Sequence, residues 1–514
     1  MHRRATAAVL TAVTATSLII APTAAQASTF ATQEIQWQKC FDQVPPGFPP
    51  GAERLECGSF TAPMDWHNPN NGKTITIAVS RLTPKTGKAK TTVFTNPGGP
   101  GGEGRSLPLV YLDRPKLSEN AEIIGIDPRG TGASSNVTCG NFMTLGSTDP
   151  RDRSKANLDL LYDGMRLQAQ YCQAKSGELG KHVTTEQTVR DLDLLRQLLG
   201  KKKVSWLGYS GGSWMGAYYA TYFPKTVDRI VLDSNAEFTG PWQPVFDDWG
   251  MGFERRFRVD FLPWVAKYDN VYHLGKTGEE VRQAYERTRA ELAEQPVTLP
   301  EGTYYPVTLD MIIRAGLYSK DSFHDTAQTL AVLAGTAQQK MGVQASYPDA
   351  QIGTLYTILC NDTPFKGDRK YLERDAVQDG KKWPLFGYYQ LMGPCAFWDR
   401  PNVNLKRPTG IGVAPTLMVQ SVRDAATPLE GAQKAHRNFK NSVLLTVEDE
   451  GDHGIYGFGN KCVNDIVERY LVDGLAPAKD LTCPGVPLPA PGDGTSNPLT
   501  KARQLATQLG WGNA

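Results

Sequence analysis

Short apolar runs rich in β-branched residues recur in two separate parts of the chain and alternate with helical patterns. The runs expected to be strands are Thr92–Thr95, Ile123–Ile126, Val204–Leu207, Ile230–Leu232, Thr416–Gln420 and Val443–Val447. The clearest helix, Val189–Leu199, has apolar residues at helical spacing and ends at Gly200. This alternation predicts an α/β protein whose mostly parallel sheet carries helices on both faces. Thr74–Arg81 alternates apolar and polar residues, and we expect it to add an antiparallel edge strand.

The alternation is absent between residues 237 and 409, where helical patterns carry many aromatic side chains. We therefore expect a mainly helical cap domain over residues 237–409, inserted into a core formed by residues 28–236 and 410–483. Residues 28–60 are expected to form an irregular N-terminal extension of that core, because prolines and glycines are frequent there. Residues 484–514 are expected to be a C-terminal tail with a short helix at its end.

The first 27 residues have a different composition from the rest. Arg3 and Arg4 precede an uncharged apolar stretch, and Ala25-Gln26-Ala27 follows it. This order is typical of a secretory signal peptide, and the apolar stretch is short for a membrane anchor. Removing residues 1–27 lowers the formal net charge from +2 to zero. A neutral chain without a run of basic residues has little to attract phosphate groups, so we expect neither nucleic acid nor a membrane as a partner.

Eight cysteines, all beyond the expected signal peptide, suit the oxidising environment of a secreted protein. They allow 105 connectivities. We expect the one that joins neighbours in sequence: Cys40–Cys57, Cys139–Cys172, Cys360–Cys395 and Cys462–Cys483. The cysteines form no C-x-x-C pair and no histidines cluster beside them, so we predict no zinc site, no other metal and no cofactor.

The most informative motif is Gly208-Tyr209-Ser210-Gly211-Gly212, which lies between a predicted strand and a helical stretch. Glycines two positions before and after a serine suit a turn that is too tight for a Cβ atom at either place. Such a turn raises the serine hydroxyl above the sheet. We therefore predict that Ser210 is a catalytic nucleophile rather than a structural serine in a turn.

A serine nucleophile needs a histidine base and an acid that orients the histidine. With a strand–turn–helix nucleophile, these residues follow in the order serine, acid, histidine. Only two of the seven histidines come after the strands resume, and one of them, His436, falls inside a helical pattern. His453, on the loop after the next strand, is the predicted base. Asp424 is the predicted acid and Asp233 its rival, since both follow the end of a predicted strand.

The oxyanion formed during attack on a carbonyl needs two backbone N–H donors. Gly211, directly after the nucleophile, is expected to supply one of them. The second is expected from Gly99 in the loop Asn96-Pro97-Gly98-Gly99-Pro100-Gly101-Gly102, because this glycine-rich loop follows a predicted strand and its backbone can turn inward.

With these pieces in place, the chain resembles the prolyl and tripeptidyl aminopeptidase family of α/β-hydrolases, and most of all its bacterial tripeptidyl aminopeptidases. The resemblance is carried by Gly98-Gly99-Pro100-Gly101, Asp127-Pro128-Arg129-Gly130-Thr131-Gly132, the Ser210 turn, and Asp424-x-x-Thr427-Pro428 with His453-Gly454. It implies a secreted, extracellular serine exopeptidase that acts as a monomer and releases short peptides, tripeptides in particular, from free N-termini. A prolyl aminopeptidase or a carboxylic ester hydrolase with the same triad is the alternative.

An exopeptidase must hold the terminal ammonium group of its substrate in a partly dry pocket, where an unpaired charge is costly. The glycine loop and the cap are the segments placed to supply a carboxylate. Glu103, directly after the glycine loop, is the first candidate and Asp362 in the cap is the second. The alternative for both is an ordinary surface acid.

Overall fold

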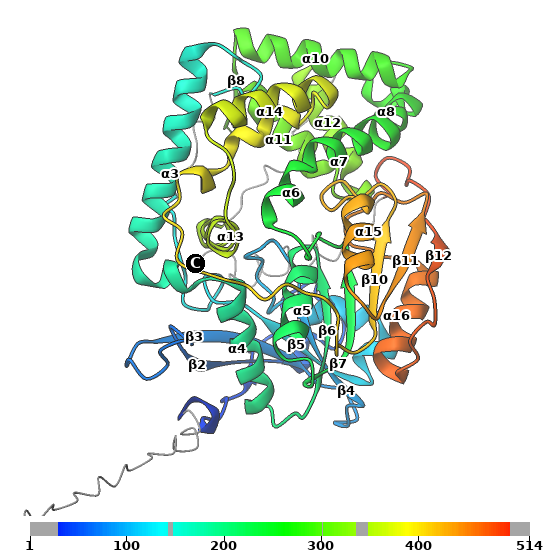
Figure 1. Ribbon diagram of the computed structural model, residues 1–514. Coiled ribbons are helices and arrows are strands. Elements are labelled where there is room, and N and C mark those ends of the chain that lie inside the picture. The colour runs from blue at the N-terminus through cyan, green and yellow to red at the C-terminus, as the bar shows by residue number, and fades with distance from the viewer. Residues whose placement is uncertain (1–28, 142–147, 301, 336–347, 494–514) are drawn as a thin grey trace, which may run out of the picture.

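One large sheet runs through the lower part of the molecule, and helices cover the end toward which its parallel strands point (Figure 1). The computed structural model describes residues 29–141, 148–300, 302–335 and 348–493. Among these residues, ten strands form the sheet in the order β1-β2-β3-β5-β4-β6-β7-β10-β11-β12. The expected signal peptide and the expected C-terminal helix lie outside the described residues.

Neighbouring strands from β5 to β12 are parallel, while β1, β2 and β3 pair in antiparallel fashion, β3 with β5 included. The strands are β1 (Gln38–Lys39), β2 (Leu55–Pro63), β3 (Thr74–Leu82), β4 (Thr91–Asn96), β5 (Ala121–Ile126), β6 (Val204–Tyr209), β7 (Val227–Asp233), β10 (Thr416–Ser421), β11 (Ser442–Glu448) and β12 (Leu481–Pro484).

The strand β3 lies inside the sheet, so the predicted edge position is wrong, although its antiparallel direction is confirmed. Along its whole length β3 pairs with β2, and its second half also pairs with β5. Most of β2 falls in the segment expected to be irregular, because a glycine, a cysteine and a proline interrupt its alternation. Gly58 is required there for packing, since a Cβ atom would lie 2.6 Å from Cγ2 of Ile35.

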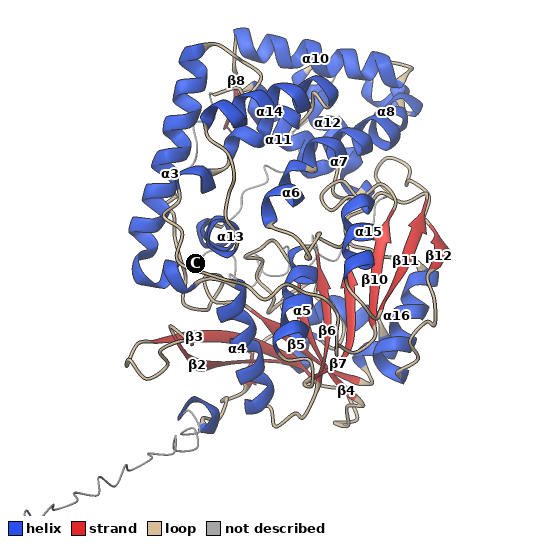
Figure 2. Cartoon of the chain, viewed as in Figure 1, coloured by secondary structure: helices blue, strands red, loops and turns tan. Residues whose placement is uncertain are grey.

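Successive residues of the central strands point to opposite faces of the sheet, which gives the sheet two apolar faces. In β7, Ile230 and Leu232 pack on one face and Val231 packs on the other. The first face is covered by α4 (Thr185–Leu198), α5 (Gly211–Tyr222) and α15 (Leu429–Asn438), and the second by α1 (Leu107–Val110), α2 (Pro115–Ser118) and α16 (Lys461–Asp473). Figure 2 shows α5 and α15 on one side of the sheet and α16 on the other, and this layering confirms the predicted α/β architecture.

The helical layer above the sheet consists of α3 (Lys155–His182), α6 (Trp242–Asp247), α7 (Trp249–Arg256), α8 (Leu262–Lys267), α9 (Asp269–Tyr272), α10 (Gly278–Glu294), α11 (Pro306–Gly316), α12 (Phe323–Leu333), α13 (Asp349–Asp362) and α14 (Arg369–Lys382). A hairpin of β8 (Val297–Leu299) and β9 (Gly302–Tyr304) accompanies them. The helix α3 precedes the predicted nucleophile, yet its Leu161 and Met165 pack with Leu372 of α14. The layer thus combines α3 with segments of residues 237–409, whose limits as a cap domain stay a prediction.

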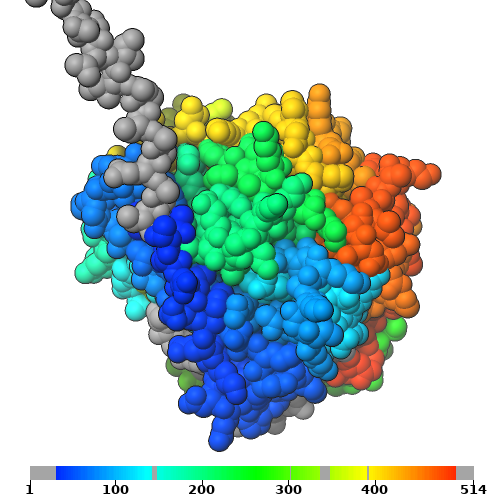
Figure 3. Space-filling view, turned by 90° about the horizontal axis from the view of Figure 1, so that it is seen from below, coloured from blue at the N-terminus to red at the C-terminus, as the bar shows by residue number. Residues whose placement is uncertain are grey.

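Four disulfides join the cysteine pairs expected from the sequence, which confirms that pairing: Cys40–Cys57, Cys139–Cys172, Cys360–Cys395 and Cys462–Cys483. The second of them ties α3 to the loop after β5, and the fourth ties α16 to β12. Seen from below, the blue N-terminal part and the orange C-terminal part both reach the face away from the helical layer (Figure 3). None of the helices in the described ranges has the length and apolar composition of a membrane-spanning segment.

Candidate active site

Ser210 occupies a strained turn between β6 and α5. Its φ of 55° and ψ of −123° lie in a region that side chains other than glycine rarely adopt. The turn needs glycine at its start, because a Cβ atom on Gly208 would lie 2.4 Å from the carbonyl oxygen of Gly212. The backbone N–H of Ser210 donates to the carbonyl of Asp233 at 2.9 Å, which ties the turn to β7. The half-buried Ser210 therefore stands at the carboxyl end of the central strands.

The neighbouring Ser213 has a structural environment instead. It is fully buried, its hydroxyl donates to the carbonyl oxygen of Ser210 at 2.5 Å, and it accepts the N–H of Ala236 at 3.0 Å. Both contacts stabilise the turn and the loop after β7. Ser210 and Ser213 thus have different surroundings, one half-buried in the turn and the other fully buried beneath it.

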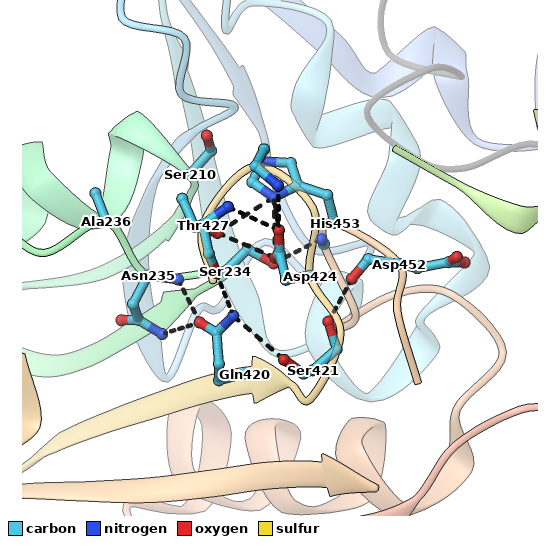
Figure 4. Close-up of polar contacts among 12 residues, drawn as sticks. Ser210, Ser234, Asn235, Ala236, Gln420, Ser421, Asp424, Thr427, Asp452 and His453 are labelled. Carbon is cyan, nitrogen blue, oxygen red and sulfur yellow. Dashed lines mark hydrogen bonds and ion pairs between the residues drawn. The ribbon is translucent and has the colours of Figure 1, made fainter. Parts of the chain in front are cut away.

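The predicted base and acid meet in a buried pair. The Nδ1 atom of His453 lies 3.0 Å from both carboxylate oxygens of Asp424, and the two side chains are 4% and 0% exposed. Asp424 also accepts hydrogen bonds from the N–H groups of Ala426 at 2.9 Å and Thr427 at 2.8 Å, and from the Thr427 hydroxyl at 3.0 Å. These donors fix the carboxylate, so that it can hold one tautomer of the imidazole. In Figure 4, Ser210 and His453 lie at the same edge of this group.

The other candidates from the sequence take different positions. His436 contacts Ser442 and Asp480 at the end of α15, away from this pair. Asp233 is fully buried, and it accepts the N–H groups of Ile455 at 3.1 Å and Tyr456 at 2.7 Å. Burial raises the pKa of Asp233 to about 7. Asp233 therefore positions the backbone that follows His453, while Asp424 contacts the imidazole.

The glycine loop lies directly against the serine turn. A Cβ atom on Gly98 would lie 2.3 Å from the carbonyl oxygen of Tyr209 and 2.8 Å from the nitrogen of Gly211. A Cβ atom on Gly211 would in turn lie 3.0 Å from the carbonyl carbon of Gly99. As the first residue of α5, Gly211 has an N–H group without an acceptor in its own helix. The contact brings the two predicted oxyanion donors, Gly99 and Gly211, to the same place beside Ser210.

The far end of the glycine loop is fixed by Asp127, which sequence reasoning noted only as part of a motif. Its Oδ1 atom accepts the N–H groups of Gly104 at 2.9 Å and Arg105 at 3.1 Å, and its Oδ2 atom accepts from Nε of Arg105 at 2.6 Å. Arg129 of the same motif forms a bidentate pair with Asp191 at 2.7 Å. The motif therefore shapes the loop and anchors it to the core.

A buried charge cluster from the helical layer holds the loop that carries His453. Asp452 accepts a hydrogen bond from Nη2 of Arg256 at 2.5 Å and from the backbone N–H of Lys320 at 2.8 Å. The Nζ atom of Lys320 donates to Glu450 at 2.6 Å. Each buried charge thus has an opposite partner, as burial requires. No pattern in the sequence indicates this cluster, because each basic residue lies more than a hundred residues from its acidic partner.

Tyr318 adds a second contact between the helical layer and the base. Its carbonyl oxygen accepts the N–H of His453 at 2.8 Å, and its ring stands edge-on to the imidazole with centroids 5.3 Å apart. Trp242 of α6 stacks on Trp214 of α5 at 3.7 Å, and both rings are buried. Aromatic side chains of the helical layer therefore pack beside the predicted catalytic residues.

The two predicted ammonium-binding acids differ in their surroundings. Asp362 is buried and accepts from the N–H of Thr185 at 2.8 Å, from the hydroxyl of Thr185 at 2.5 Å and from Nε1 of Trp242 at 3.3 Å. Burial raises its pKa to about 6. Its contacts join α13 to α4 and α6, and both of its carboxylate oxygens already accept hydrogen bonds from these helices. Glu103 is half-buried and directly follows the glycine loop, one residue before Gly104, whose N–H donates to Asp127.

Four aspartates of the helical layer lie close together at the end of α6 and on α14: Asp247, Asp248, Asp375 and Asp379. Burial, and then repulsion from the other three carboxylates, raises the pKa of Asp247 to about 7. An unfolded aspartate ionises near pH 3.8. Between these two values the folded protein binds a proton that the unfolded chain has released, so this group lowers stability as pH rises through that window.

Asp247→Asn should therefore raise the melting temperature relative to the parent by an amount that is near zero at pH 4 and grows until about pH 7. Thermal melts of both proteins across this pH range would measure the difference. The control, Asp465→Asn, should act in the opposite direction, because Lys461 lowers the pKa of the exposed Asp465 and the variant loses that favourable charge above about pH 4. A pH-independent difference for Asp247→Asn would contradict this assignment.

Within the described residues, no group of three or more His, Cys, Asp and Glu side chains is arranged to hold a metal ion. The site brings together a serine hydroxyl, an oriented imidazole, a buried carboxylate and the backbone of the glycine loop, from which the predicted oxyanion donors come. That set is suited to acyl transfer.

Comparison with known proteins gives the same picture. A family model for the alpha/beta hydrolase fold matches residues 91–268, and a model for TAP-like proteins matches residues 383–483. A tripeptidyl aminopeptidase of Streptomyces lividans is 34% identical over 462 residues, which cover 85% of each chain. The serine protease Hip1 of Mycobacterium tuberculosis is 25% identical over 492 residues (88% of this chain and 91% of that one). Carboxylesterase B of Mycobacterium tuberculosis is 25% identical over 464 residues (83% and 86%).

Proposed function

The chain belongs to the tripeptidyl aminopeptidase family of α/β-hydrolases and is a serine hydrolase, and on this basis we propose that it is a secreted exopeptidase that releases tripeptides from free N-termini. The observation that carries the proposal is the buried Asp424–His453 pair beside the Ser210 turn. The similarity to the Streptomyces enzyme spans the core and the helical layer alike, which favours a shared substrate class.

In the proposed reaction, neutral His453 takes the proton of Ser210 as the hydroxyl oxygen attacks the scissile carbonyl. The N–H groups of Gly99 and Gly211 stabilise the oxyanion. The imidazolium, held by Asp424, then gives its proton to the leaving amine, and the tripeptidyl group remains as an ester on Ser210. Water, activated by His453, hydrolyses this acyl-enzyme and restores the serine.

The helical layer supports the preference for chain ends. Tyr318 packs against His453, and Trp242 stacks on Trp214 of the helix that begins directly after Ser210. A long polypeptide that crossed the site in both directions would meet the helical layer, whereas an N-terminus can enter and stop. We propose Glu103 as the carboxylate that meets the terminal ammonium group, because it follows the glycine loop that contacts the serine turn.

Acetylating the N-terminus of a good tripeptidyl amide should lower kcat/KM by at least about a hundredfold, because the charge that pairs with the enzyme carboxylate is lost. Release of the amine, followed for the free and the acetylated substrate, measures this ratio. Glu103→Gln should reduce the ratio if Glu103 is the partner. Equal cleavage of both substrates would contradict the exopeptidase proposal.

Ester hydrolysis is the second candidate, favoured by the similarity to Carboxylesterase B. It uses the same nucleophile, base and oxyanion donors. Comparing a tripeptidyl amide with a simple acyl ester of similar size separates the two. An esterase would cleave the ester rapidly and leave the amide intact, and it would be indifferent to a free ammonium group.

A further inference from the structure

Arg314, at the end of α11, places its guanidinium among aromatic rings of the helical layer. Its central carbon lies 5.3 Å from the ring centroid of Trp249, 5.9 Å from that of Phe253 and 5.5 Å from that of Phe386. Phe253 is fully buried and Phe386 is 8% exposed, while Arg314 and Trp249 are half-buried. Rings that contact the faces of a guanidinium leave the N–H groups at its edge available as donors.

This arginine has no anionic partner among the residues that the structure describes, and its buried Nε atom has no hydrogen-bond acceptor there. Two buried arginines of the helical layer are paired with carboxylates. Arg289 contacts Asp310 and Asp149, and Arg256 contacts Asp452. A partly desolvated cation without an acceptor is costly, and the cost is recovered when an anion binds.

The unpaired guanidinium lies close to the proposed catalytic residues. Phe253, which it contacts, packs on Tyr318 with ring centroids 5.4 Å apart, and Tyr318 packs on His453 at 5.3 Å. These steps place Arg314 within the reach of about five extended residues from the imidazole. The separation between Arg314 and the imidazole is therefore within the length of a short peptide.

We propose that Arg314 binds a carboxylate of the peptide substrate, which gives the enzyme a preference for acidic peptides. The chemistry is that of a charge-assisted hydrogen bond from a planar guanidinium to a carboxylate, with the rings holding the guanidinium in place. The carboxylate can come from an aspartate or glutamate side chain, or from the C-terminus of a short peptide. This inference rests on the proposed function for the identity of the ligand as a peptide.

The test measures inhibition of the hydrolysis of a small acyl ester by peptides, so it does not depend on tripeptidyl cleavage. Three pairs of tripeptide amides carry glutamate or glutamine at the first, second or third position, and a fourth pair compares a tetrapeptide with its C-terminal amide. In the parent enzyme, at least one pair should show about tenfold or more tighter inhibition by the carboxylate, and the pair that does so identifies its source. Ratios near one in all four pairs overturn the proposal without any variant.

Arg314→Gln should bring that ratio close to one, and Arg314→Lys should keep part of it. Arg314→Glu should reverse the ratio, so that the uncharged peptide of the pair inhibits more tightly than the carboxylate. Arg282→Gln is the matched control, because Arg282 pairs with Glu279 on the surface of α10 and should leave the ratio unchanged. A ratio that Arg314→Gln leaves intact overturns the assignment to Arg314. Absence of tripeptidyl amide cleavage would contradict the proposed function, but the inhibition ratios would still test Arg314.

Discussion

Ser210→Ala is expected to lower kcat on a tripeptidyl amide by about a millionfold, because the attacking hydroxyl is lost while the fold is retained. Alanine keeps the Cβ atom of serine, so the backbone strain at φ 55° is the same in both proteins and the turn should keep its shape. Single-turnover and steady-state release of the amine measure the effect, and circular dichroism checks the fold.

Ser213→Ala is the matched control three residues away. It removes two buried hydrogen bonds, to the carbonyl of Ser210 and from the N–H of Ala236, so it should lower stability. It should keep most of kcat. Losses of similar size in both variants, with both folded, would mean that the nucleophile cannot be assigned to Ser210.

Asp424→Asn is expected to lower kcat by about ten-thousandfold, because an amide beside Nδ1 favours the wrong tautomer of His453. Asp233→Asn should cost less than about tenfold. Asparagine can still accept the N–H groups of the loop after His453, and burial has already raised the pKa of Asp233 to about 7, so a neutral side chain is tolerated there. Measuring kcat for both variants decides between the two acids, and a larger loss in Asp233→Asn would reassign the acid.

The nucleophile turn, the order of the catalytic residues and the glycine loop could be predicted because each is a local pattern. A turn between a strand and a helix shows its glycines within five residues, and parallel strands bring their carboxyl ends to one edge of the sheet. The sequence therefore placed Ser210, Asp424 and His453 at the ends of the right strands, although their roles stay predictions.

The choice between Asp424 and Asp233 could not be made from the sequence with the same force. Their strands, β10 and β7, are neighbours in the sheet, and each aspartate lies at or just after a strand end. What separates them is the direction of each side chain, which depends on the loop that follows. The Asp424 loop returns two N–H groups to its own carboxylate, while Asp233 is used by the backbone of a segment more than two hundred residues away.

The position of β3 inside the sheet and the contacts of the helical layer could not be predicted either, because both depend on pairing between distant parts of the chain. A strand such as β2 that contains glycine and proline has no clear period, and contacts such as that of Arg256 with Asp452 join residues 196 apart. A one-dimensional pattern carries no information about such pairs. Arg314 is an example, because a sequence pattern cannot show that its buried Nε atom lacks a hydrogen-bond acceptor among the described residues.

The contacts between the helical layer and the two catalytic loops have a consequence for how this enzyme can be engineered and how it becomes active. A Cβ atom on Gly252 of α7 would lie 2.2 Å from the carbonyl oxygen of Ala425, and Arg256 and Tyr318 hold the segment at His453. The predicted insertion is therefore part of the scaffold of the predicted acid and base. Exchanging it for the insertion of a relative would disturb turnover along with selectivity, and a newly made chain would gain activity only after the insertion has docked.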